Sequence, residues 1–231
     1  MRFTPAGETP TPDGEYLKPT RFFDFDREEV RRFAESTARG ESSDVGKAVK
    51  LFYAVRDGWR YDPFAIDLRP EAYAASHVLR AKAAYCIPKA VLLTALARAV
   101  GIQAGIGTSD VVNHLTTEKL KARMGGKTLF IHHGYAVMYL EGSWVKAAPA
   151  FNIELCDRFG VLPTEFDGRS HAIFQPYDAR NRRHMEYVRD HGVWSDLPYE
   201  RISRDLREFY PANAVGGEDA GERFEDGVRV D

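Results

Sequence analysis

The chain has 231 residues, of which 44% are hydrophobic and 12% aromatic, and its formal net charge is −2. This length and apolar content suffice for a substantial core in one domain. The near-neutral charge gives no electrostatic reason to bind nucleic acid or an anionic membrane, and no run reaches the roughly 20 apolar residues of a membrane span. The first ten residues lack the apolar core of a signal peptide, so we expect a cytoplasmic protein.

The first 60 residues predict an extended arm followed by two helices. Residues 1–22 are rich in proline, threonine and glycine, which predicts an arm lying on the domain surface. Asp26 is followed three residues later by Glu29, a variant of the capping box that predicts the start of a helix. Ser43 is a suitable N-cap for a second helix, whose apolar residues form one stripe.

Cys86 stands where a loop enters a long apolar helix. A short helix over 75–80 precedes that loop, and the run 86–100 is apolar almost all round, which predicts a buried central helix ending at Gly101. Amides at a helix N-terminus favour thiolate over thiol, so Cys86 is a candidate nucleophile. Free cysteine is also a common buried residue, and position alone does not decide between the two interpretations.

A strand over 102–107 and a polar, partly helical insertion over 113–127 follow the cysteine helix. Insertions of this kind are natural substrate-facing loops. Residues 128–140 are rich in β-branched and aromatic residues and predict a strand, which a tight turn joins to a second strand over 144–147.

The predicted strand 128–140 carries the adjacent residues His132 and His133. Side chains alternate across a strand, so the two point to opposite faces and only one can meet Cys86. A cysteine at a helix start and a histidine on a strand form the arrangement that cysteine-dependent acyl transfer needs.

The C-terminal third predicts three more helices. The apolar spacing of residues 152–160 predicts a short helix with Cys156 packed inward as a structural residue. Two cysteines cannot build a disulfide scaffold. Two further helices are predicted over 178–189 and 198–207. The other histidines lack metal-ligand spacing, so we expect neither a metal nor another cofactor.

Residues 45–150 resemble the transglutaminase-like superfamily of papain-type cysteine enzymes, in which the cysteine helix is followed by a histidine strand. In that pattern Cys86 is the nucleophile, and the spacing selects His133 as its partner. Four segments match elements of the family in the same order: residues 48–61, 98–102, 133–139 and 144–149.

The resemblance implies an α+β fold with a papain/transglutaminase-like core, in which N-terminal helices and a central Cys-bearing helix pack on an antiparallel β-sheet. We expect an N-terminal arm over 1–22 and a single transglutaminase-like domain over 23–211 with a C-terminal helical extension. A flexible acidic tail is predicted over 212–231, where apolar residues are few.

Ala148 is the main departure from the family, since it stands where the family has the aspartate that orients the histidine. A methyl group cannot accept a hydrogen bond, and a catalytic imidazole needs its second ring nitrogen held. Asn152 is the first candidate replacement, because papain-type enzymes use asparagine in this role, and Asp167 is the second. An ordinary turn asparagine is an equally good interpretation of Asn152.

These residues predict a cysteine-dependent acyl-transfer enzyme acting on a peptide or amide carbonyl, with Cys86, His133 and Asn152 as its catalytic residues. Analogy favours hydrolysis of a peptide or protein substrate over transfer to an amine. One alternative follows from the missing aspartate at Ala148: a domain with weakened catalysis that binds peptides. Another is an enzyme of the arylamine N-acetyltransferase kind, which has the same Cys, His, Asp order but also needs the aspartate.

Overall fold

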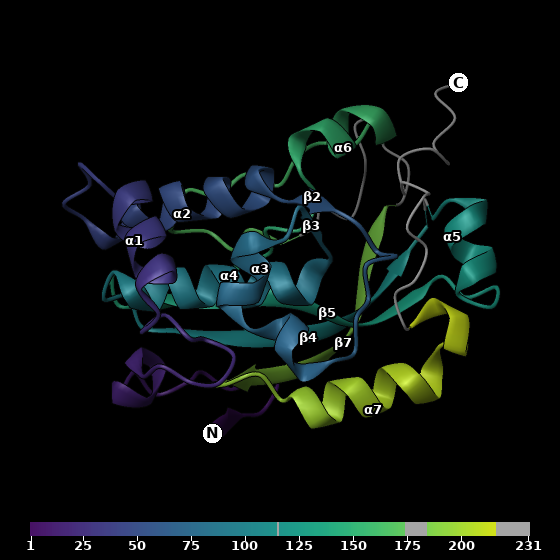
Figure 1. Ribbon diagram of the computed structural model, residues 1–231, viewed down its shortest axis with the longest axis horizontal. Helices are drawn as coiled ribbons and strands as arrows, with labels where there is room; N and C mark the ends of the chain where they lie inside the picture. Colours follow the sequence, from purple (N-terminus) through teal and green to yellow (C-terminus); the bar gives the residue numbers. More distant parts are fainter. Residues whose placement is uncertain (115, 174–183, 216–231) are drawn as a thin grey trace.

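A five-stranded antiparallel sheet forms the centre of the protein (Figure 1). The computed structural model describes residues 1–114, 116–173 and 184–215. The strands lie in the order β1 (Phe3–Thr4), β7 (Met185–Trp194), β4 (Ala104–Asn113), β5 (Leu129–Leu140) and β6 (Ser143–Ala147). A separate parallel pair joins β2 (Arg60–Tyr61) to β3 (Ala83–Ala84).

Helix α4 (Cys86–Ala99) lies between the sheet and the first three helices (Figure 1). Every residue from Cys86 to Arg98 is buried, as expected for a helix that is apolar almost all round. The helices that cover it are α1 (Glu28–Thr37), α2 (Asp44–Gly58) and α3 (Ala75–Arg80). The expected α+β arrangement, with a central Cys-bearing helix on an antiparallel sheet, is confirmed.

The shorter elements occupy the ends of the sheet and the surface. Three of them are α-helices: α5 (Glu118–Arg123), α6 (Ile153–Phe159) and α7 (Tyr199–Phe209). Three are single 3-10 turns: η1 (Gly14–Leu17), η2 (Pro70–Tyr73) and η3 (Ala212–Ala214). None of the described helices is long and apolar enough to span a membrane.

The N-terminal arm is fixed to the sheet at two places. Strand β1 pairs with the end of β7, with Phe3 opposite Trp194. Further along, the indole Nε1 of Trp144 donates a hydrogen bond of 2.7 Å to the carbonyl of Pro10. The first residues of the chain therefore complete one edge of the sheet.

Two local predictions differ from the structure. Helix α1 begins after Arg27 without a side-chain cap, although Ser43 caps α2 as expected by accepting a bond from the Gly46 amide. The helix predicted over 178–189 is wrong from Met185 onward, because β7 occupies that stretch between β1 and β4. Its earlier residues, and positions 216–231 of the predicted tail, lie outside the described residues.

Candidate active site

Cys86 is the first residue of α4, and the backbone of β5 passes directly over it. A Cβ added to Gly134 on β5 would lie 2.9 Å from the Cα of Ile87, so only glycine allows this approach. Backbone N–H groups of Gly134, Ile87 and Cys86 itself donate hydrogen bonds to the sulfur and favour its thiolate. The first turn of α4 and the strand therefore surround the thiol with amide donors.

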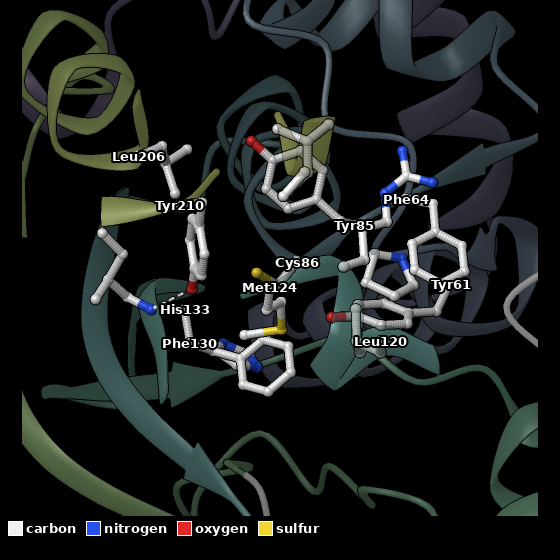
Figure 2. Close-up of a pocket in the computed structure, with 15 residues that line it drawn as sticks. Tyr61, Phe64, Tyr85, Cys86, Leu120, Met124, Phe130, His133, Leu206 and Tyr210 are labelled. Carbon is white, nitrogen blue, oxygen red and sulfur yellow. Dashed lines mark hydrogen bonds between the residues drawn. The ribbon is translucent and has the colours of Figure 1, made fainter. Parts of the chain in front are cut away.

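His133 lines the same pocket as Cys86 (Figure 2). The cavity in this pocket is about 50 Å³, enough for water. Its walls are mostly apolar and come from β2 and the segment after it, from α5 and from the end of α7; they include Tyr61, Phe64, Leu120, Met124, Leu206 and Tyr210. Residues of the insertion over 113–127 thus line the pocket.

Burial determines the protonation state of the pair. It raises the pKa of the Cys86 thiol to about 11, against the opposing effect of the amide donors. Burial also lowers the pKa of His133 to about 4. Both side chains are therefore neutral at pH 7, whereas the helix N-terminus alone predicted a thiolate; desolvation outweighs the helix amides.

The side chains of the two candidates for the third catalytic residue are bonded to other groups. The side-chain oxygen of Asn152 accepts a bond of 2.9 Å from the Tyr61 amide, and its nitrogen donates one of 2.7 Å to Glu154. Asp167 is exposed and accepts bonds from backbone N–H groups of its own turn. Ala148 is fully buried in a small apolar cluster with Tyr135, Val137 and Val193.

A family model of the transglutaminase-like superfamily matches residues 31–149, more than half of the chain. The chain belongs to the transglutaminase-like superfamily. A crystal structure of a "putative cysteine protease" from Cytophaga hutchinsonii is similar at 16% identity and a TM-score of 0.46, covering 79% of this chain. The chain spans 56% of the length of that protein. No curated protein matches it.

This transglutaminase-like chain has a fully buried lysine one turn after the cysteine. Lys89 Nζ donates to the carbonyls of Arg56, Trp59 and Ala150 at 2.7–2.8 Å. Burial lowers the pKa of Lys89 to about 7. The lysine ties α4 to the end of α2 and to the segment after β6. A lysine in the first turn of the otherwise apolar run 86–97 was the available sequence signal.

His132 points away from the Cys86 pocket of the transglutaminase-like domain, toward α7. Its Nε2 lies 2.8 Å from Asp205 Oδ2, and its Nδ1 lies 3.1 Å from the hydroxyl of Thr108. Sequence analysis missed these partners, because they lie on β4 and α7 and no local pattern connects them to the histidine. Within the described residues, no cluster of three or more His, Cys, Asp or Glu side chains could hold a metal ion.

Proposed function

We propose that this protein is a cysteine-dependent acyl-transfer enzyme that hydrolyses a peptide or amide bond. The observation that carries the proposal is the shared pocket of Cys86 and His133, at the start of a buried helix in a transglutaminase-like domain. A thiol and an imidazole in one pocket supply a nucleophile and a base for acyl transfer.

The reaction follows from the groups in the pocket. His133 takes the proton of the Cys86 thiol, and the sulfur attacks the substrate carbonyl carbon. The amide N–H groups that surround the sulfur can also bind the oxyanion that forms. His133 then gives its proton to the leaving amine, which leaves an acyl-enzyme. Water attacks this thioester with His133 as base and releases the acid and the free thiol.

Burial of the two side chains opposes the first of these steps. The pKa values of Cys86 and His133 differ by about 7, which corresponds to about 10 kcal/mol for moving the proton from sulfur to ring before the two charges attract each other. The ion pair therefore forms when more water enters the pocket and solvates the two charges.

Asn152 is the third residue of the proposed site. Its amide is bonded to Tyr61 and Glu154, so it contributes by holding Tyr61 at the pocket wall. This differs from the orienting role that papain-type asparagines have on the imidazole ring.

A second candidate function is binding of peptides without turnover. The small volume of the cavity and the neutral state of the Cys86 and His133 pair favour this alternative. A domain that binds peptides without turnover would retain the fold and the two side chains but form no thiolate.

Alkylation of the full chain with iodoacetamide from pH 5.5 to 10.5 distinguishes the two functions. Mass spectrometry follows Cys86, with Cys156 as an internal reference because burial raises the pKa of Cys156 to about 12. An activated pair gives a reactive component of Cys86 below pH 8 that His133→Ala removes, with a loss of about tenfold or more at pH 6.5. A single rise at high pH, identical in both proteins, would refute the enzyme proposal.

A further inference from the structure

Strand β5 contains a β-bulge immediately before His133. Ser109 pairs with His133 and Val111 pairs with Phe130, so two steps along β4 match three steps along β5. Within the bulge, His132 has a φ of 56°, in the left-handed region that residues other than glycine rarely adopt. The chain thus places a non-glycine residue in a costly conformation directly before the proposed base.

The bulge determines where His133 points. Residues three apart on a regular strand face opposite sides of the sheet. Phe130 and His133 nevertheless both line the Cys86 pocket, as Figure 2 shows. One extra residue in the strand shifts the alternation, which is how bulges re-aim side chains beside active sites.

Both backbone N–H groups of the bulge are bound by side chains instead of by the neighbouring strand. The Ile131 amide donates to the hydroxyl of Tyr210 at 2.9 Å, the dashed contact in Figure 2, and that hydroxyl donates to the Leu129 carbonyl. The His132 amide donates to Asp110 Oδ1 at 3.0 Å. These bonds hold the bulge from α7 and its following residue on one side and from β4 on the other.

The ring of His132 is held equally firmly. It lies between the Thr108 hydroxyl and the Asp205 carboxylate, and it stacks on His191 with ring centres 4.4 Å apart. His191 Nε2 in turn lies 2.7 Å from the same Asp110 oxygen that binds the His132 amide. Backbone and side chain of His132 therefore share one buried network.

This network is not a second active site. Thr108, His132 and Asp205 follow the hydroxyl, imidazole, carboxylate order of a hydrolytic triad. Thr108 is fully buried and belongs to none of the cavities found among the described residues. A hydroxyl without access to substrate cannot act as a nucleophile, so the network has a positioning role.

We propose that His132 is the positioning residue for His133, and that its locked left-handed backbone aims the imidazole into the Cys86 pocket. The bulge then performs the orienting task that falls to an aspartate at the position of Ala148 in the family. This inference rests on the proposed function, because it assumes that His133 acts on Cys86.

Substitutions at residue 132 test the backbone directly. His132→Ala and His132→Gly both remove the ring, but only glycine adopts the left-handed conformation without cost, and His132→Asn tolerates it better than alanine. The readout is the His133-dependent component of Cys86 alkylation at pH 6.5. We expect alanine to lower it about tenfold and glycine and asparagine to retain more of it, in the order of backbone preference.

The hairpin residue Glu141 supplies a matched control, because it is the other described non-glycine residue with positive φ, at 47°. Glu141→Ala and Glu141→Gly are expected to change the melting temperature and leave the alkylation profile unchanged. Thr108→Val removes one ring partner of His132 and leaves the backbone preference of residue 132 unchanged. We expect this variant to lose about threefold of the His133-dependent alkylation of Cys86, and it replaces His132→Ala as the test if His132→Ala does not fold.

The outcomes separate the two proposals. If His133→Ala leaves Cys86 alkylation unchanged, the enzyme proposal itself fails. If His133→Ala lowers it but the folded variants at residues 132 and 108 match the wild type, the positioning role of His132 is overturned and the enzyme proposal stands. Equal losses of alkylation in the alanine, glycine and asparagine variants would also overturn the positioning role of His132, since the effect would then not follow the backbone preference of residue 132.

Discussion

Gly134→Ala is expected to separate strand β5 from the first turn of α4. The added methyl group would lie 2.9 Å from the Cα of Ile87 and 3.3 Å from its backbone nitrogen, and neither atom can rotate away as a side chain would. Overpacking of this kind costs about 1–3 kcal/mol. For a chain of this size, each kcal/mol shifts the melting temperature by about 2–4 °C, so we expect a decrease of about 2–12 °C.

The same substitution acts on the proposed chemistry. The Gly134 amide is one of the donors to the Cys86 sulfur, and His133 is the neighbouring residue on the displaced strand. Moving the strand away weakens that donor bond and increases the separation between ring and thiol. The His133-dependent alkylation of Cys86 at pH 6.5 should therefore decrease together with stability.

Gly58→Ala is the matched control. Gly58 ends α2, and a Cβ there meets no atom within 4 Å. We expect this variant to be neutral or more stable by up to about 1 kcal/mol, since alanine restricts the unfolded chain. Urea unfolding and thermal melts measure both variants. A free energy of unfolding for Gly134→Ala within about 0.5 kcal/mol of the wild type would refute the packing argument.

Two further substitutions test the buried polar contacts around the pocket. The pKa of Lys89 is about 7 in the folded protein, against an ordinary value of 10.5. Between these two pH values the unfolded chain binds more protons than the folded one. The free energy of unfolding of the wild type should therefore rise with pH in this range, by up to about 1.4 kcal/mol per pH unit. Lys89→Met should lose this slope in urea unfolding at pH 6.5, 8.0 and 9.5, and a constant difference between the two proteins contradicts the assignment. Asn152→Ala leaves the buried Tyr61 amide without its acceptor and should cost about 1–3 kcal/mol in the same assay. It should preserve His133-dependent alkylation, whereas a loss as large as that of His133→Ala would mean that Asn152 supports the ring.

The central helix and the adjacent hairpin could be predicted because their signals are local. Fourteen residues from Cys86 to Ala99 form α4, close to the predicted run, and Gly101 follows its end. The turn Glu141-Gly142 joins β5 to β6 as its residues indicate, with positive φ at both positions. Such elements are determined by apolar pattern and turn chemistry within a short window.

Strand β7 could not be predicted in the same way. The charged residues along 178–189 favour an exposed helix, and within the strand only Met185 and the run from His191 to Trp194 are buried. Its conformation is determined by pairing with β4 over most of its length and with β1 at its end. Both partners are distant in sequence, so tertiary pairing overrides the local preference.

The same distinction between local and distant determinants applies to the candidate site. Family order locates Cys86 and His133, but the sequence did not show that burial reverses the expected ionisation of the thiol. Nor could it show the bonds from Asp110 and Asp205 to His132, which come from residues 22 and 73 positions away. Local pattern thus identifies the proposed reacting groups, and the surrounding packing determines their charge and direction.

Alanine at position 148 is consistent with a neutral pair of Cys86 and His133 and with a strand β5 that is held in place at His132. An aspartate at that position would place a carboxylate in a fully buried cluster with Tyr135, Val137 and Val193, where an unpaired charge costs several kcal/mol. The imidazole of His133 gives it no positive partner at rest, because burial holds its pKa at about 4. A carboxylate repays its burial only by stabilising an imidazolium, whereas a β-bulge fixed through its own backbone N–H groups orients the His133 ring in either protonation state. Because both groups are neutral at rest, the orienting task is met at lower cost by the backbone at His132 than by a charge at residue 148.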